Sequence, residues 1–381
     1  MTICAAAAPR LEAAFCRRSF LAALVLAGCR AKKGTGFRGY ALVANSGGKN
    51  LTAVDLTRFF VARTIPLSAS PSVVVGPPGK PVAYALTPQD GTVHEVSLAR
   101  LERTRHSRPA TQVVTMRITP AGDALWVLAS RPARLLRVDL ESLRVGARIE
   151  LPAVPVSFDL SPDGTLAAVS LGEQGVCLAG LASGKSEAVI RTAGATERVC
   201  FRSDGRQILA ALPAERLLAI IDVERQRTLV RLALGMSPRH FAVKADGGQV
   251  FVTGEGLDAV AVVYPYSTEV AETLLAGASP GTMTTSANPD YLFVAGVGAG
   301  SVTIFDIETR RLLALVRVGD EPCSIHITPD NQYALVLNRG SGDMAVIRLA
   351  ALSGRRMKAA PLFTVVPVGS HPVHAAILGV S

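Results

Sequence analysis

The chain has 381 residues, of which 49% are apolar and 18% charged, and its formal net charge is +10 at pH 7. This composition excludes an intrinsically disordered chain, because such chains combine low hydrophobicity with high net charge. The basic residues lie singly or in pairs between apolar stretches, without the basic stripe interleaved with aromatics that nucleic-acid binding requires. We expect no nucleic-acid partner, and we interpret the densest basic segments, 100–108 and 354–358, as solvated outer loops.

The first 28 residues have the features of an export signal. Arg17 and Arg18, followed by Phe20 and Leu21, match the twin-arginine pattern, and a short apolar stretch runs on to Gly28. That stretch is far shorter than the roughly 20 residues of a transmembrane helix. We therefore predict a signal peptide over 1–28, with twin-arginine export favoured and general secretion the alternative.

The segment Leu26-Ala27-Gly28-Cys29 resembles the bacterial lipobox. The resemblance implies cleavage before Cys29, acylation of Cys29 and a lipidated tether over 29–38. Several acyl chains anchor a protein firmly. We expect an exported protein on the periplasmic side of a bacterial membrane, held there by lipid. Arg30 stands where Asp would retain such a lipoprotein, which favours the outer membrane.

The rest of the chain repeats a tight turn built from Pro, Asp, Asn or Gly, most clearly at 161–164 and 328–331. Anchors for this turn at residues 77, 120, 162, 203, 245, 287 and 329 are 43, 42, 41, 42, 42 and 42 residues apart. A strand-rich repeat of about 40 residues is the size of one β-propeller blade.

Each repeat contains four strand-sized apolar runs. In one unit these are Val156–Leu160, Thr165–Ser170, Gly175–Leu181 and Glu187–Arg191, each bounded by residues that favour turns. A sustained helical stripe is lacking, so helices should be few and short. The pattern predicts an all-β propeller of four-stranded antiparallel blades. An Asp recurs at the end of the third strand, at positions 55, 139, 222 and 306, and we interpret it as a turn residue.

Seven full units begin near residues 71, 113, 155, 197, 238, 280 and 322. Tyr40–Pro66 supplies three outer strands without an inner one, and Pro372–Leu378 supplies an inner strand without outer ones. Joined in one blade, these terminal strands would close a ring over a single domain, 39–381. Eight blades are favoured, and seven are the alternative.

Two segments, Tyr40–Asn45 and Tyr333–Asn338, carry a family resemblance together with Val54–Thr57 and Phe305–Thr309. With the Pro-Asp-Gly inner turn, they resemble the YVTN-type β-propeller repeats. That family is related in fold to the d-type haem domain of cytochrome nitrite reductase and to bacterial lactonase propellers. The resemblance covers 39–379 and is specific for fold rather than function.

The innermost strands of a propeller line its central channel. Aligned by the turn, one position of these strands is polar in every unit and the next is apolar. The polar residues are Ser72, Thr115, Ser157, Arg198, His240, Thr282, Ser324 and His374. Two residues further on, the polar face returns at Arg117, Asp159 and His326. We predict a polar ring at a channel mouth, with candidate ligand-binding residues Arg198, His240, His374, His326, Arg117 and Asp159.

Two hypotheses for the function follow. Since catalytic motifs are missing from the sequence, we expect a monomeric, non-enzymatic scaffold without a cofactor that binds a protein, peptide or small ligand. The alternative is a redox propeller that binds haem or a divalent metal through His240, His326 or His374. Cys177, Cys200 and Cys323 are expected to be free thiols, with a Cys177–Cys200 disulfide as the other possibility.

Overall fold

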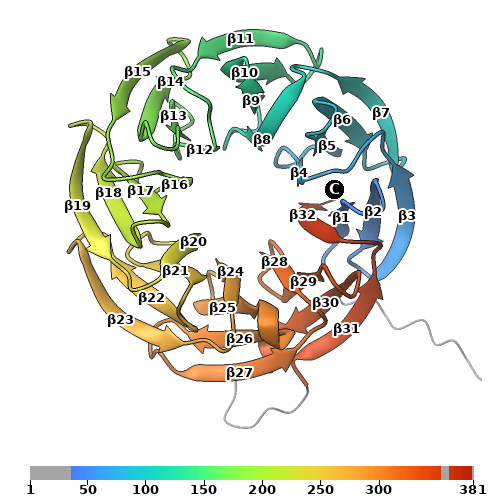
Figure 1. Cartoon of the computed structure of the whole chain (residues 1–381). Helices are drawn as coiled ribbons and strands as arrows, with labels where there is room; N and C mark the ends of the chain where they lie inside the picture. Colours follow the sequence, from blue (N-terminus) through green and yellow to red (C-terminus); the bar gives the residue numbers. More distant parts are fainter. Residues whose placement is uncertain (1–35, 353–359, 380–381) are drawn as a thin grey trace, which may run out of the picture. The chain divides into compact units, whose positions relative to one another are not determined.

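The computed structural model describes residues 36–352 and 360–379. They form a ring of eight four-stranded antiparallel blades around a central hole (Figure 1). The inner strand of each blade faces the hole, and the outer strand forms the rim. The eight-blade prediction is therefore confirmed, and the seven-blade alternative is wrong.

The strands are grouped blade by blade along the chain. The first four blades contain β4 (Val73–Val75), β5 (Val82–Thr87), β6 (Thr92–Ser97) and β7 (Glu102–Ser107); β8 (Gln112–Ile118), β9 (Ala124–Arg131), β10 (Ala133–Asp139) and β11 (Val145–Glu150); β12 (Ser157–Leu160), β13 (Leu166–Ser170), β14 (Val176–Gly180) and β15 (Lys185–Ile190); and β16 (Arg198–Phe201), β17 (Gln207–Leu212), β18 (Leu217–Asp222) and β19 (Arg227–Ala233). The next three contain β20 (Ser237–Val243), β21 (Val250–Glu255), β22 (Ala259–Tyr264) and β23 (Glu269–Leu275); β24 (Pro280–Thr285), β25 (Tyr291–Gly296), β26 (Ser301–Asp306) and β27 (Leu312–Arg317); and β28 (Pro322–Ile327), β29 (Tyr333–Asn338), β30 (Asp343–Arg348) and β31 (Leu362–Pro367). The eighth contains β32 (Pro372–Gly379), β1 (Gly39–Asn45), β2 (Asn50–Asp55) and β3 (Phe60–Pro66).

The core lies between blades. The second strand of a blade is buried along its length, as in β25, because neighbouring blades cover both faces. The outer strand alternates between exposed and half-buried residues, as in β23. Large side chains fill the space between neighbours: Trp126 of one blade and Phe158 of the next belong to the same apolar cluster. A blade therefore reaches its stable packing only within the ring.

The recurrent Asp residues close turns, as predicted from their position. A side-chain oxygen of Asp55 accepts the N–H of Thr57 at 2.7 Å, and Asp306 accepts the N–H of Thr309 at the same distance. Asp139 and Asp222 make the equivalent contacts with Ser142 and Arg225. These four aspartates are thus committed to local backbone geometry rather than to a ligand.

Strands from both ends of the chain close the ring. β1 pairs antiparallel with β32 from Gly39 opposite Gly379 to Asn45 opposite Pro372. The amide of Asn45 adds a tie to the seventh blade, since its Nδ2 donates to the carbonyl oxygen of Val368 at 2.9 Å. The predicted joining of the two terminal segments in one blade is confirmed.

The predicted export and lipidation residues, Arg17, Arg18, Phe20, Leu21 and Cys29, lie outside the described residues. Within 36–352 and 360–379 the helices are the short 3-10 turns η1 (Val297–Ala299) and η2 (Leu349–Ala351). In this part of the chain no helix is long and apolar enough to cross a membrane.

Ring closure gives a direct test of the architecture. Deletion of residues 372–381 removes β32, leaves one edge of β1 unpaired and uncovers the apolar faces beside it. We expect a fall in melting temperature of at least about 10 °C by circular dichroism, because each kcal/mol lost shifts the melting temperature of a large domain by about 2–4 °C. Deletion of Val380 and Ser381 alone is the control. An unchanged melting temperature after the longer deletion would contradict the closure.

Candidate functional site

The central channel contains a cavity of about 780 Å³. Its walls come from the inner strands β4, β8, β12 and β16, with Phe241 of β20 and His374 of β32 completing it. The apolar wall includes Val75, Met116, Phe158 and Val199. The polar wall includes Thr115, Arg117, Ser157, Asp159, Arg198 and His374. A recess of this size whose wall combines apolar and polar surface suits a small ligand.

The cavity gathers four of the six predicted ligand-binding residues. Arg117, Asp159, Arg198 and His374 line it. His240 and His326 are not among the residues of its wall, although His240 occupies the position in its strand equivalent to that of Arg198. Of the eight apolar residues that follow these positions, six are buried, Met116, Phe158, Val199, Met283, Ile325 and Ala375, whereas Val73 and Phe241 are half-buried and line the cavity.

Arg117 and Asp159 connect three consecutive blades. The Nε of Arg117 on β8 donates to the carbonyl oxygen of Phe158 on β12 at 2.9 Å and lies 3.3 Å from Oδ1 of Asp159. Oδ2 of Asp159 accepts the backbone N–H of Phe201 on β16 at 2.9 Å. Both charged groups are therefore engaged in holding neighbouring inner strands together.

Hydroxyl groups make the same kind of contact elsewhere on the ring. Ser157 donates to the carbonyl oxygen of Glu197 at 2.9 Å, and Thr282 donates to that of Cys323 at 3.1 Å. Each bond runs from an inner strand to the backbone of the next inner strand. Much of the polar ring thus satisfies backbone groups that border the channel.

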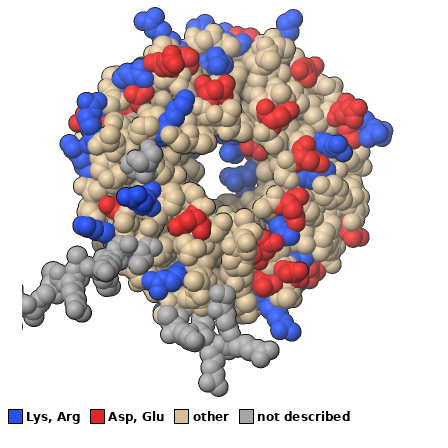
Figure 2. Space-filling model, turned by 180° about the vertical axis from the view of Figure 1, so that it is seen from behind, with Lys and Arg blue, Asp and Glu red and all other residues tan. Residues whose placement is uncertain are grey.

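Arg198 differs from these residues. It begins β16, its side chain is exposed to the channel, and its guanidinium makes no hydrogen bond or ion pair with the described residues. Burial between the channel walls, together with the positive charge of Arg117, lowers its pKa. Figure 2 shows basic side chains inside the hole of the ring. Arg198 is thus a charged group without a counterion on the wall of the cavity.

The histidines of the inner strands are neutral at pH 7. Burial and the neighbouring His374 lower the pKa of His326 to about 3. Burial and Arg117 lower the pKa of His374 to about 4, and burial and Arg198 lower that of His240 to about 4. Neutral imidazoles leave the arginines as the cations of the channel wall.

Two of these imidazoles also tie blades together at the closing seam. Nε2 of His326 on β28 accepts the N–H of Ala375 on β32 at 3.3 Å and lies 2.8 Å from the hydroxyl of Ser324. Nδ1 of His374 on β32 is 3.5 Å from the N–H of Val74 on β4. The two rings pack edge to face, with centroids 5.3 Å apart.

The predicted metal alternative finds limited support in this geometry. Among the described residues, no group of three or more His, Cys, Asp or Glu side chains could hold a metal ion. His374 alone of the three histidines lines the cavity, and its Nε2 makes no hydrogen bond to the described part of the chain. One imidazole nitrogen is therefore accessible for a cofactor in the channel.

The three cysteines of the propeller are free, as predicted, and Cys177 and Cys200 do not pair. Cys177 is buried, whereas Cys200 and Cys323 are half-buried. Sequence reasoning did not place Cys200 on the cavity wall, where the structure finds it. Burial and the nearby carboxylate of Asp159 raise its thiol pKa to about 12, so it is not a reactive thiolate.

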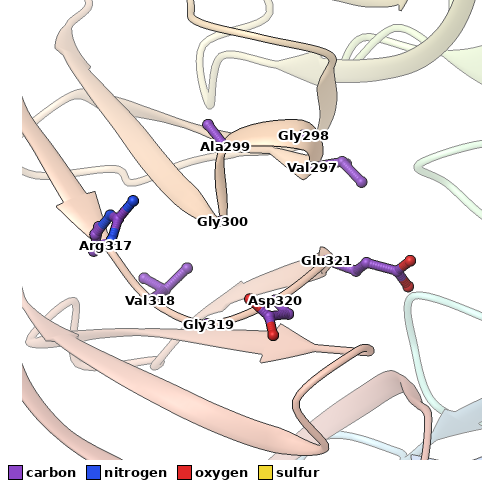
Figure 3. Close-up of a pocket in the computed structure, with 9 residues that line it drawn as sticks. All are labelled: Val297, Gly298, Ala299, Gly300, Arg317, Val318, Gly319, Asp320 and Glu321. Atoms are coloured by element: carbon purple, nitrogen blue, oxygen red, sulfur yellow. The ribbon is translucent and has the colours of Figure 1, made fainter.

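A second hollow, of about 520 Å³, lies between the turn 297–300 and the segment 317–321. Figure 3 shows its walls as largely bare backbone at Gly298, Gly300 and Gly319, with Arg317 and Glu321 at opposite ends. Glu321 already pairs with Arg339 at 3.1 Å. Sequence reasoning missed this hollow, for which the glycine-rich turn was the available signal. Its polar side chains do not converge.

Comparisons with known proteins agree on the fold. Residues 218–358 match a family described as lactonase, 7-bladed β-propeller. The solved structure of the dihydro-heme d1 dehydrogenase NirN in complex with DHE is similar, with a TM-score of 0.73 and 16% identity over 87% of this chain and 74% of that one. The hydrazine synthase of Kuenenia stuttgartiensis has a TM-score of 0.59 and 18% identity over 74% of this chain and 96% of that one. No curated protein matches the sequence.

The neutral histidines predict a pH dependence of stability. In the unfolded chain a histidine is protonated near pH 6.5, whereas folded His326 and His374 take up protons at about pH 3 and 4. Between these values the unfolded state binds more protons, so stability is complete above pH 6.5 and falls as the pH is lowered toward 4. His94, with a pKa lowered to about 4 by burial and Arg103, acts in the same direction.

The measurement is the melting temperature between pH 8 and pH 4. We expect the double variant His326→Gln, His374→Asn to lose part of the decline below pH 6.5, and the exposed control His371→Gln to retain it. Parallel curves for the double variant and the parent would show that the seam histidines do not carry the effect.

Proposed function

We propose that this chain is a non-enzymatic, membrane-tethered propeller that binds a small ligand in its central channel. The observation that carries the proposal is the cavity of about 780 Å³, whose wall combines apolar and polar side chains. Because the binding surface is recessed, a small molecule suits it better than the flat surface of a folded partner.

The contacts of the channel strands favour binding over catalysis. Ser324 and His326 lie within hydrogen-bond distance, as a nucleophile and its base would. However, His326 has a pKa of about 3, its Nε2 already accepts the N–H of Ala375, and neither residue belongs to the cavity wall. A base that weak contributes little at neutral pH. The thiol of Cys200 is likewise protonated.

The proposed membrane tether rests on the sequence. A lipobox ending at Cys29 precedes the propeller by only about ten residues, and acylation would hold the domain at the membrane surface through its lipid. We place the protein on the periplasmic side of a bacterial membrane, with the outer membrane favoured. It acts there as a monomer, with the propeller in the aqueous phase beside the membrane.

Lipidation is testable with one substitution. In bacteria fed radiolabelled palmitate, the parent chain should incorporate label and partition into detergent, and Cys29→Ala should do neither, because the acylated sulfur is gone. Cys323→Ala is the matched control, since it removes a thiol within the propeller. Label retained by Cys29→Ala would refute the tether.

A redox propeller that binds haem or a metal is the second candidate. One observation favours it: the unpartnered Nε2 of His374 beside the cavity, which could ligate iron in a bound cofactor. NirN is described as a dihydro-heme d1 dehydrogenase, but its 16% identity to this chain carries the likeness no further than the fold.

Filling the channel tests the proposed binding. Thr115 lines the cavity, and its hydroxyl makes no hydrogen bond to the described residues, so Thr115→Trp should occupy the space while leaving the ties between blades intact. We expect residues 30–381 to retain small molecules from a bacterial extract in equilibrium dialysis, and Thr115→Trp to retain at least about tenfold less, as expected when a bulky side chain fills a recessed site. Leu275→Trp, at a site 82% exposed on β23, is the control.

Metal content and the absorption spectrum are recorded on the same samples. A stoichiometric metal or a haem band that disappears in His374→Ala would favour the second candidate. Equal retention by Thr115→Trp and the parent, or no retention by either, would overturn channel binding.

A further inference from the structure

The charged side chains of the channel wall are unequally paired. Arg117 and Arg198 are the basic residues of the wall, and Asp159 is its acidic residue. Asp159 is engaged on both oxygens, by Arg117 and by the N–H of Phe201. With the histidines neutral, two positive charges and one negative charge leave the wall with a net charge of +1. The surplus resides at Arg198.

An unpaired guanidinium in a recess is unfavourable unless something compensates it. Water reaches Arg198 from the channel, but the surrounding walls remove part of its hydration and lower its pKa. The group carries five N–H donors in a planar fork that matches a carboxylate or a phosphate. The described residues supply it with no acceptor, so these donors are available to a ligand.

Arg117 extends the positive region, and His240 lies beside Arg198 as a neutral imidazole. Arg117, whose side chain is 50% exposed, is close enough to Arg198 to lower its pKa. His240 occupies the equivalent position on the next blade, and its buried Nδ1 has no hydrogen-bond partner. The positive charge of Arg198 helps keep that imidazole neutral. An anion at Arg198 would therefore meet two guanidinium groups and no unpaired carboxylate.

The rest of the wall indicates what the anion is attached to. Phe241 on the next inner strand lies at the position after His240 and lines the cavity with a half-buried ring, whereas Val199 beside Arg198 is buried. Burying this apolar surface against a hydrocarbon group of a ligand is favourable, whereas a small hydrated ion would not cover it.

We propose that the channel binds an organic anion whose carboxylate or phosphate pairs with Arg198 while its apolar body packs against Phe241. This inference rests on the proposed channel binding and adds the class of ligand. Arg198 selects for negative charge, and Arg117 provides a second cation while holding β12 in place.

Three probe ligands distinguish the contribution of the negative charge from that of the apolar chain. Octanoate carries a carboxylate on an apolar chain, octanamide is its neutral counterpart, and inorganic phosphate has charge without a body. We expect residues 30–381 to bind octanoate in isothermal titration at least about tenfold more tightly than octanamide, as for hydrogen bonds to a charged partner. Phosphate should bind more weakly than octanoate.

Substitutions test whether Arg198 is the residue that binds the anionic group. Arg198→Gln should weaken octanoate binding about tenfold or more and leave octanamide unchanged, because it removes the charge and keeps the neighbouring walls. Arg198→Lys should retain part of the affinity. Arg191→Gln removes an exposed arginine outside the cavity wall and should behave like the parent. Melting temperatures establish that each variant is folded.

The outcomes distinguish the two proposals. Equal binding of octanoate and octanamide, abolished by Thr115→Trp, would overturn the anion inference and leave channel binding standing. Octanoate binding that is unaffected by Arg198→Gln would also overturn it. Phosphate binding as tightly as octanoate would show an inorganic ion site instead. Failure of all three probes to bind at millimolar concentration would overturn the anion inference, while dialysis against the extract still decides channel binding.

Discussion

The inner strand of every blade is the edge of a sheet, and its free backbone groups must be satisfied next to an open channel. The ring solves this with side chains from the neighbouring inner strand. Arg117 donates to the carbonyl oxygen of Phe158, Ser157 donates to that of Glu197, and His326 accepts the N–H of Ala375. The requirement accounts for part of the polar character of these strands, whereas the hydroxyl of Ser72 and the guanidinium of Arg198 make no such tie among the described residues.

The same ties give the closing blade its particular chemistry. β32 comes from the end of the chain and pairs with β1 from its start, so this seam holds the ring together. On both sides of the seam the ties use imidazoles, through His326 to β32 and from His374 to β4. An imidazole can accept such a bond only while that nitrogen is unprotonated. Ring closure is therefore coupled to pH in a way that hydroxyl ties elsewhere are not.

The period of the turns was enough to predict the blades, their number and the pairing of the terminal strands. Strand bounds followed closely, with Val156–Leu160 predicted and β12 observed over Ser157–Leu160. The sequence also located the polar positions, because alternation along a strand depends only on local geometry. It could not tell that His374 lines the cavity while His240 and His326 do not. That difference depends on the packing of blades far apart in sequence.

The glycine-rich turn alone was a weak signal for the hollow between 297–300 and 317–321. The hollow arises where a glycine-rich turn meets the connection between two blades, and the space between them depends on the packing of those blades rather than on a residue pattern. The second and third strands, by contrast, are buried on both faces and leave a regular apolar signal.

The polar side chains of the inner strands can either hydrogen-bond the backbone of a neighbouring blade or bind a ligand. Where a polar group ties two blades, changing it to suit a new ligand also removes a bond that the edge strand requires. Asp159 is in that position, because both of its oxygens are engaged. Arg198 is not, since its side chain serves no neighbouring backbone group among the described residues. In a propeller built this way, specificity can change most freely at the inner positions that the ring does not use, and Arg198 holds one of them.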